Sequence, residues 1–586
     1  MTEGLEVTAT ADGAETPGAE IPSDSFMLES WGWTSNPDAC EPKIHALASL
    51  LNLEAPAPVG RVTYQSKGNA LVIAGRDESR ARAAALALAP QLHVTLIGPR
   101  RIEGSGLIAW AGSIQSLGGY LGEFTATVDA LDTGTGAAAK PVEAKFDLVL
   151  DFGDASHFAM RQPPQGYYRA PADEARLGAM LEEMRGAVGE FEKPRYFAYR
   201  ENICAHSRSG IEGCNACIEI CSTQAISPDG DHVKVDPHLC MGCGACSTVC
   251  PSGAMSYQFP RVADRGAQMK QLLSAYRVAG GQTPCLVFHN STDGRDLLAA
   301  AATEGPGLPA HALPMDAWHV AAVGLDLLLP AVAFGARQVV VLATGAEDAQ
   351  YVAALKAQMA IGEAMLSALG YTGRHFAVIE AGSPEALAQG FAALGEATPV
   401  PVPATFLLSS DKRTAIEFAL EHLVKHAPTR VEEIALPAGS PYGEVRVDAS
   451  KCTMCMACVG SCPESALMDG VDQPLLKFLE RNCVQCGLCE STCPEDAITL
   501  NPRLLRTPAV REARVLNQTQ PFHCVRCDKP FGTKQMVEAM LGRLVGHSMF
   551  TQPEALSRLQ MCADCRVVDM MQSKNEVSVL KLGSDS

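Results

Sequence analysis

Cysteine is the residue type whose number and spacing say most about the chemistry of this chain. The 586 residues contain 22 cysteines, and sixteen of these form two groups of eight, within residues 204–250 and 452–493. In the second group the pattern Cys-x2-Cys-x2-Cys-x3-Cys-Pro occurs twice. Thiolates at this spacing hold [4Fe–4S] clusters, and each half of such a run gives its fourth cysteine to the cluster of the other half. The sequence therefore predicts iron–sulfur electron-transfer chemistry.

The spacing also predicts which cysteines share a cluster. A short loop directs three thiolates at one cluster, and the fourth cysteine begins a helix that leads to the neighbouring cluster, with proline suited to the first helical position. The first group departs from the pattern twice: nine residues separate Cys204 from Cys214, and Ser222 replaces the proline after Cys221. We expect four clusters with crossed ligands, as in bacterial two-cluster ferredoxins. The ligand sets are Cys204, Cys214, Cys217 and Cys250 for cluster one; Cys240, Cys243, Cys246 and Cys221 for cluster two; Cys452, Cys455, Cys458 and Cys493 for cluster three; and Cys483, Cys486, Cys489 and Cys462 for cluster four.

Disulfides and zinc are the other common uses of closely spaced cysteines. Disulfides form in oxidising compartments, and the sequence shows no secretory signal. Zinc prefers two CxxC pairs to runs of four cysteines followed by proline. We therefore expect clusters in both groups, and a cytoplasmic protein.

Four further cysteines near the C-terminus have a different spacing. Cys524 and Cys527 form one CxxC pair, and Cys562 and Cys565 form another. Two such pairs are typical of a closed structural zinc site, so we expect zinc in a zinc-ribbon-like module. A fifth iron–sulfur cluster is the alternative.

Charge and hydropathy exclude some classes of protein. The formal net charge of −19 argues against nucleic-acid binding, because contacts to phosphate need a basic surface. An acidic surface suits docking to a basic redox partner. Residues 317–336 are apolar enough to resemble a membrane span, but they contain Asp326 and Pro330, so we expect buried helices and no span. No Ser–His–Asp set, P-loop or HExxH motif is present, so we assign no catalytic residue; the oligomeric state stays open.

Two stretches alternate strand and helix. In the first, residues 70–75, 93–98 and 146–151 are predicted strands, and residues 78–89 are a predicted helix. The turn that begins at Gly75 lacks the second and third glycines of a dinucleotide-binding loop, so we expect a degenerate Rossmann-like domain without FAD or NAD.

The second alternating stretch runs from about residue 283 to 398, with predicted strands at 285–289, 311–315, 338–343 and 375–380 and a predicted helix at 346–369. In its order of elements, its strand ends and Tyr351, this stretch resembles the delta subunit of methyl-viologen-reducing hydrogenase. The resemblance implies a flavodoxin-like α/β domain with a small cluster held by cysteines after the strands. Here residues 315–318 and 344–349 contain no cysteine, so we expect the scaffold without its cluster ligands.

Two more resemblances concern the ends of the chain. The Rossmann-like start followed by a dicluster ferredoxin is similar to the flavin subunit of heterodisulfide reductase. The residues around Cys524 and Cys562, CVRCDKPFGT and MCADCRVV, resemble the tail of large ferredoxin-like proteins associated with bacterial formate dehydrogenases. The second resemblance implies a dehydrogenase as a redox partner.

These expectations combine into a multidomain protein of the α/β and α+β classes. We expect an iron–sulfur carrier that relays electrons between redox partners, one of which is a formate dehydrogenase. The alternatives are an adaptor or maturation factor for a molybdenum or iron–sulfur oxidoreductase, and a subunit of a flavin-dependent oxidoreductase. The expected segments are 1–60 (N-terminal, partly disordered), 61–165 (Rossmann-like), 166–194 (helical linker), 195–265 (dicluster ferredoxin), 266–400 (hydrogenase-delta-like), 401–440 (connector), 441–505 (second dicluster ferredoxin) and 506–586 (four-cysteine module).

Overall fold

The computed structural model describes residues 40–100, 106–132, 141–470, 473–550 and 553–572. Most of the N-terminal segment that we expected to be partly disordered lies outside these ranges. Its last part is helical, with α2 at Glu41–Ser49 and η3 at Leu50–Asn52. Helix α2 packs against α7 (Val262–Val278), and the ammonium group of Lys43 donates a hydrogen bond to the carbonyl of Pro309, 2.9 Å away. This helix therefore belongs to the core of the middle domain.

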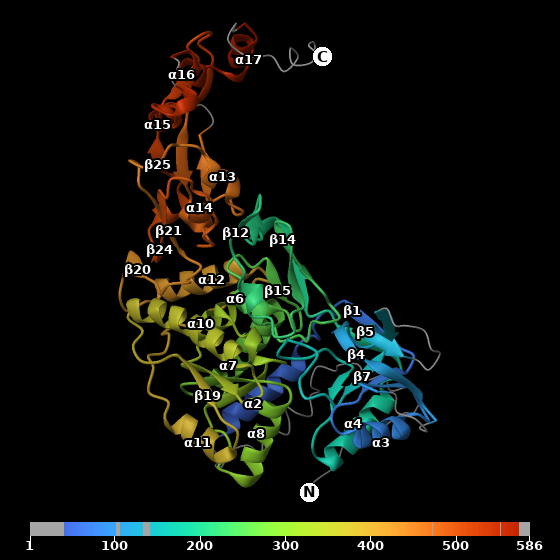
Figure 1. Cartoon of the computed structure of the whole chain (residues 1–586). Coiled ribbons are helices and arrows are strands. Elements are labelled where there is room, and N and C mark those ends of the chain that lie inside the picture. The colour runs from blue at the N-terminus through green and yellow to red at the C-terminus, as the bar shows by residue number, and fades with distance from the viewer. Residues whose placement is uncertain (1–39, 101–105, 133–140, 471–472, 551–552, 573–586) are drawn as a thin grey trace, which may run out of the picture.

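The N-terminal domain is built on a seven-stranded sheet with the order β6-β5-β4-β3-β2-β7-β8. Strands β4, β3, β2, β7 and β8 are parallel, and β5 and β6 extend the sheet with antiparallel neighbours. Helices α3 and α4 cover one face of this sheet, where they pack against β2 and β3 (Figure 1). The bounds are β2 Asn69–Ile73, α3 Glu78–Leu88, β3 His93–Gly98, β4 Ile108–Gly118, β5 Phe124–Asp132, β6 Val142–Phe146, β7 Leu148–Asp151, β8 Tyr167–Arg169 and α4 Glu174–Gly186.

The single strand expected at residues 146–151 is two strands, because the chain breaks at Asp147. The Asp147 carboxylate accepts hydrogen bonds from the backbone N–H groups of Lys67 and Asn69, both at 2.9 Å. These bonds hold the start of β2 beside the start of β7. Strand β6, which directly precedes β7 in the sequence, lies at the edge of the sheet, four strands away from β2. A separate two-stranded antiparallel sheet pairs β1 (Arg61–Ser66), at the start of this domain, with β9 (Gly189–Pro194), at its end.

The middle domain has a four-stranded parallel sheet with the order β17-β16-β18-β19. Strands β16 and β18 are buried along their whole length, as expected for central strands covered on both faces. One face packs against α7, α9 and α10, and the other face against α8 and α11. The bounds are β16 Cys285–His289, α8 Asp293–Glu304, β17 Ala312–Asp316, α9 Leu325–Ala333, β18 Gln338–Ala343, α10 Ala349–Ala368, β19 Phe376–Glu380 and α11 Pro384–Ala392.

The apolar stretch at residues 317–336 contains one short α-helix and no span. Helix α9 is nine residues long and entirely buried, and the turn η5 (Val320–Ala322) precedes it. Among the described residues, no helix combines the length and the apolar character needed to cross a bilayer.

Each half of the two dicluster domains consists of a strand, a cysteine loop, a short helix and a strand, as the repeats predict. In the first domain β10 (Phe197–Tyr199) pairs with β15 (Met255–Tyr257), and β13 (Ile226–Asp229) pairs with β14 (His232–Val235). In the second, β21 (Gly443–Val447) pairs with β24 (Ile498–Leu505), and β22 (Leu467–Asp469) pairs with β23 (Leu475–Phe478). The short helices are α5 Ala216–Glu219, α6 Ala245–Val249, α13 Ala457–Ser461 and α14 Leu488–Thr492.

Figure 1 shows how these parts follow one another along the molecule. The first dicluster domain lies against the middle domain and the N-terminal sheet, and the second lies beyond it, joined by α12 (Lys412–Lys425). The C-terminal module, drawn in red, extends from the far side of the second dicluster domain. Its elements are β26 Pro521–His523, β27 Pro530–Thr533, α15 Lys534–Leu544, α16 Pro553–Leu559 and α17 Ala563–Gln572.

Candidate iron–sulfur and metal centres

Two cavities in the second dicluster domain are each lined by four cysteines. The cysteines come together in the crossed combinations that the spacing predicts, three from one half and the fourth from the other. One cavity is lined by Cys452, Cys455, Cys458 and Cys493, and the other by Cys462, Cys483, Cys486 and Cys489. Their remaining walls are mainly apolar, with Leu476 and Ile498 in the first and Leu467 and Leu488 in the second. A cysteine-lined, apolar cavity fits a [4Fe–4S] cluster, whose ligands are thiolates.

The cysteines of the first dicluster domain also lie in crossed sets. Burial raises the pKa of Cys217, and so do the neighbouring Cys250, Cys214 and Cys204. Burial raises the pKa of Cys240 to about 11, with further contributions from Cys243 and Cys221. Buried thiols packed this closely cannot all be ionised on their own, because each added negative charge opposes the next. Iron would remove that barrier by replacing the protons, so this donor set suits a bound cluster.

The chain turns in the same way after the fourth cysteine of each half. The third residue beyond it has a positive φ in every half: Gln224 (50°), Gly253 (75°), Ser465 (50°) and Asp496 (47°). The turn brings a backbone N–H back to the cysteine: the Sγ of Cys462 accepts from Ala466 at 3.2 Å, and the Sγ of Cys493 accepts from Ala497 at 3.4 Å. The matching exit sequences are therefore the turns that supply N–H donors to ligand sulfurs.

Side chains from other domains surround the cluster-two ligands. The Tyr351 hydroxyl, on α10 of the middle domain, donates to the Sγ of Cys243 at 3.4 Å. Lys193, from β9, donates to the carbonyl of Cys240 at 2.8 Å. In cluster four the side-chain amide of Gln485 donates to the Sγ of Cys483 at 3.3 Å. Sequence spacing could not reveal Tyr351 or Lys193 in these roles, because both are far from the cysteines along the chain.

Two consecutive residues at the start of α12 hold the two dicluster domains together. Lys412 is buried, and its ammonium group donates to the carbonyls of Ser247, Thr248 and Cys250 at 2.7 to 3.0 Å. Arg413 donates to the carbonyl of Cys483 at 3.3 Å. One helix end thus contacts a ligand loop in each domain.

The two dicluster domains also meet directly. The extra residues between Cys204 and Cys214 form a hairpin, β11 (Ser207–Arg208) with β12 (Ile211–Glu212), and β12 packs against α14 of the second domain. A Cβ atom added at Gly213 would lie 2.5 Å from Cγ of Leu488, so only glycine allows this approach. Cys214 is close enough to Cys486 to contribute to the raised pKa of that thiol, which burial dominates. The cysteine sets expected for clusters one and four are therefore neighbours across the interface.

His206 lies in the same insertion, between Cys204 and Cys214. It is buried, and its Nδ1 lies 3.4 Å from the carbonyl oxygen of Cys214.

Cys40 and Cys285, which belong to no cysteine group, are both buried in the hydrophobic core. The turn at Gly75 is also filled, since a Cβ there would lie 1.9 Å from the carbonyl oxygen of Phe152. That glycine is explained by the close approach of the backbone after β7.

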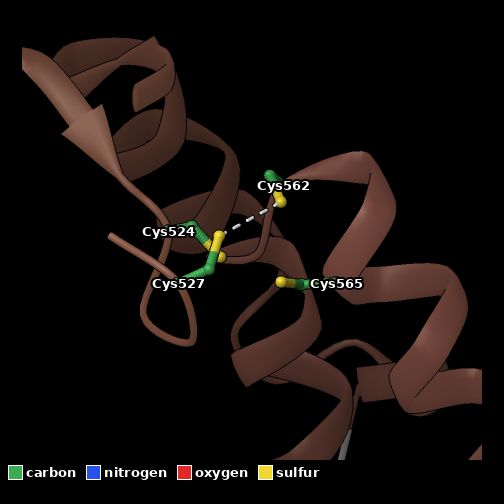
Figure 2. A group of neighbouring side chains, drawn as sticks. All are labelled: Cys524, Cys527, Cys562 and Cys565. Atoms are coloured by element: carbon green, nitrogen blue, oxygen red, sulfur yellow. Dashed lines mark hydrogen bonds between the residues drawn. The ribbon is translucent and has the colours of Figure 1, made fainter. Parts of the chain in front are cut away.

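The four C-terminal cysteines lie close together. Their sulfur atoms all lie within 4.8 Å of one another, and within the described ranges no other group of three or more His, Cys, Asp or Glu side chains does so. Figure 2 shows the four sulfurs converging, with 3.7 Å between those of Cys527 and Cys562. A tetrahedral zinc ion with Zn–S bonds of about 2.3 Å requires sulfurs about 3.8 Å apart. A cubane places its thiolates on four separate irons, and they must lie farther apart.

The environment of Cys524 favours its thiolate, whereas hydrogen bonds with the neighbouring cysteines raise the pKa of Cys565 to about 12. Burial acts to raise the pKa of Cys524, but backbone N–H groups of Cys562, Arg526 and Cys527 lower it to about 6. Cys524, Met561 and Cys562 form the small buried core of the module. The hydroxyl of Thr533, which caps α15, donates to the carbonyl of Thr453 in the cluster-three loop at 3.1 Å. The module therefore rests on the cluster-three end of the second dicluster domain.

Comparison with known proteins agrees with the cysteine geometry. Residues 212–254 and residues 451–498 match two families, each described as a 4Fe-4S dicluster domain. The chain is 38% identical over 66 residues to hydrogenase-4 component A of Escherichia coli (strain K12), covering 11% of this chain and 30% of that protein. It is 37% identical over 43 residues to ferredoxin 7Fe of Hydrogenibacillus schlegelii and 44% identical over 39 residues to a ferredoxin of Alicyclobacillus acidocaldarius subsp. acidocaldarius. Each of these matches covers 7% of this chain, and 55% and 50% of the two ferredoxins.

The chain thus spans about a third to about half of the length of these relatives. The matches and the cavities define an iron–sulfur protein with two ferredoxin-like dicluster domains, a kind of domain used in electron transport. The remaining domains lie outside the matched segments.

Proposed function

We propose that this chain relays electrons between redox proteins, and that its sixteen grouped cysteines hold four [4Fe–4S] clusters in the spatial order two, one, four, three. When bound, each cluster supplies a one-electron centre that makes and breaks no substrate bond. The order rests on the packing of α5 against α6, of β12 against α14 and of α13 against α14, and on electrostatic interactions between the ligand thiols. Cys217 of cluster one contributes to the raised pKa of Cys246 in cluster two. Cys214 of cluster one contributes to the raised pKa of Cys486 in cluster four. Cys458 of cluster three contributes to the raised pKa of Cys489 in cluster four.

The observation that carries this proposal is the interface between the dicluster domains. Without it, the two domains would be separate pairs of clusters on one chain. The approach of β12 to α14 at Gly213 and the bridge made by Lys412 and Arg413 bring two ligand loops together. We therefore infer one continuous line of centres.

The two ends of this line differ in exposure. The cluster-two ligands are covered by the middle domain and the N-terminal domain, as the contacts of Tyr351 and Lys193 indicate. At the other end Cys455 is exposed to solvent. A partner protein that docks at the cluster-three end therefore gains the closest approach to a ligand. The formal charge of −19 suits a partner with a basic docking surface.

We further propose zinc in the C-terminal module and a dehydrogenase as one partner. The close sulfurs of the four C-terminal cysteines support zinc. The resemblance of this module to ferredoxin-like proteins associated with formate dehydrogenases supports that enzyme as the partner. An adaptor protein would bind such an enzyme without exchanging electrons with it, so rapid reduction of the chain by formate dehydrogenase and formate separates the two functions.

The relay is tested by removing one ligand at the interface. The wild-type chain, isolated without oxygen, is expected to contain about sixteen iron and sixteen sulfide. In Cys486→Ala, cluster four is lost, and the reduced cluster-one EPR signal should lose the broadening caused by its neighbour. Cys452→Ala, which removes a ligand of cluster three, is the matched control and should leave the cluster-one signal unchanged. Equal effects of the two variants on that signal would contradict the proposed order.

A further inference from the structure

A cavity of about 200 Å³ lies beside the cluster-two end of the protein, outside the cysteine sites. It is formed where the carboxyl end of β17 meets the start of α7 and the segment that follows α2. Its walls include Leu50, Pro58, Phe259, Arg265, Asp316 and Trp318. The carboxyl ends of parallel strands are the usual place for ligands in open α/β sheets. No function assigned above uses this cavity.

Aromatic rings form one wall of the cavity. The rings of Phe259 and Trp318 lie almost perpendicular, with their centroids 5.2 Å apart. Trp318 has a left-handed backbone conformation (φ 58°), which is costly for a residue with a large side chain. Such a conformation persists where the surrounding structure requires it, and here it turns the chain directly after β17, at the cavity.

Two charged side chains, Arg265 and Asp316, line the cavity, and one oxygen of Asp316 has no hydrogen-bond partner among the described residues. Arg265 is 8% exposed, and its guanidinium donates a hydrogen bond to the side-chain oxygen of Gln268 at 3.0 Å. Asp316 accepts bonds from Ser291 and from the N–H of Trp318 at Oδ1, but its Oδ2 is buried and has no partner among the described residues. Burial lowers the pKa of Arg265, and the nearby carboxylates of Asp316 and Asp264 act in the opposite direction. Buried charges without full hydrogen bonding cost free energy, so both groups indicate a polar ligand.

We propose that this cavity binds a planar heteroaromatic ligand of the flavin class. The ring system would lie against Phe259 and Trp318, with one edge toward Arg265 and Asp316. The isoalloxazine edge carries a carbonyl acceptor next to an N–H donor, so it satisfies the guanidinium and the carboxylate together. A purely apolar ligand would satisfy neither group, and an anionic ligand would be repelled by Asp316. The cavity is separate from the turn at Gly75 in the N-terminal domain, where we expect no dinucleotide.

The cavity is connected to the cluster-two ligands by aromatic contacts. The Trp318 ring stacks on Tyr196 with centroids 6.0 Å apart. Tyr196 in turn lies on Gly242, between Cys240 and Cys243, where an added Cβ would meet its ring at 2.6 Å. Oxidised flavin would therefore take up two electrons in succession through cluster two, together with two protons from solvent, with a redox partner as the electron source. This redox role, unlike the binding itself, rests on the proposed relay.

The binding is tested by titrating the full chain with riboflavin and recording the quenching of flavin fluorescence, which stacking on an aromatic ring produces. The wild type should quench the fluorescence with a saturable curve. Asp316→Asn and Arg265→Met should each weaken binding at least tenfold. Arg277→Met, an exposed position on the same helix, is the matched control and should bind as the wild type does. Iron content equal to that of the wild type shows that each variant is folded around its clusters.

The ligand can be varied as well, which removes any dependence on variant folding. A flavin methylated at N3 cannot donate to Asp316 and should bind the wild type at least tenfold more weakly than riboflavin. Absence of saturable quenching, or equal binding of the two flavins, would overturn the proposal. If riboflavin binds but the reduced protein does not bleach its yellow absorbance, the binding site stands and the relay to cluster two is wrong.

Discussion

The hydroxyl of Tyr351 lies 3.4 Å from the sulfur of Cys243 and donates a hydrogen bond to it. The two residues are 108 positions apart and belong to different domains, so the middle domain reaches directly into the ligand shell of cluster two. This contact gives an α/β domain without cysteine ligands of its own a role at an iron–sulfur site.

Replacing Tyr351 by phenylalanine should lower the reduction potential of cluster two. A hydrogen bond to a ligand sulfur stabilises the more negative, reduced cluster, so its loss favours the oxidised form. We expect a shift on the order of 50 mV, which corresponds to about 1 kcal/mol for one electron. Potentiometric EPR titration measures it. Tyr371→Phe, whose hydroxyl donates to the carbonyl of Leu423 away from any cysteine, is the control and should shift nothing.

Adding one methyl group at Gly213 should separate the dicluster domains. The new Cβ would lie 2.5 Å from Cγ of Leu488 and 2.7 Å from the carbonyl oxygen of Ala205, closer than such atoms approach. Gly213→Ala should keep its full iron content but lose the magnetic interaction between clusters one and four, seen in EPR relaxation. Gly460→Ala adds the same methyl group within α13, where nothing lies within 4 Å, and should behave as the wild type. An unchanged interaction in Gly213→Ala would mean that the interface is not close.

Replacing Cys562 by serine should release zinc without loss of iron. Zinc content is expected to fall from about one per chain to none, because a closed site needs all four thiolates. Helices α16 and α17 should then exchange their amide hydrogens faster, since Cys562 belongs to the small core that holds them. Cys285→Ala, at a buried position outside every cysteine group, is the control for zinc. Loss of iron together with zinc would favour a fifth cluster.

The stability of the protein should respond to the titration of Lys43. Burial lowers the pKa of this lysine to about 8, from 10.5 for an exposed lysine, although Cys40 acts in the opposite direction. Between these two pH values the unfolded chain binds more protons at this residue than the folded chain does, so stability rises with pH. The melting temperature of the wild type should therefore increase relative to that of Lys43→Met from pH 8 to pH 10.5. A constant difference between the two proteins would contradict a buried, charged Lys43.

Some parts of the fold could be predicted well because they depend on local sequence. The strands at residues 93–98, 285–289 and 338–343 occur at the predicted positions, since each is a continuous run of apolar residues in a parallel sheet. The break at Asp147 was missed, because it depends on hydrogen bonds to Lys67 and Asn69 across the sheet. Fixed spacing predicted the cysteine sets, whereas Tyr351, Lys193 and Lys412 reach their partners only through the packing of domains.

The insertion between Cys204 and Cys214 has a consequence for oxidative damage. In a free two-cluster domain both ligand loops face water, but here β12 places Gly213 against Leu488 and covers one side of Cys214. Cys455, at the far end of the line, is exposed. Oxygen and peroxide should therefore attack the cluster-three site first, so that a chain damaged in air loses cluster three and keeps the other three centres.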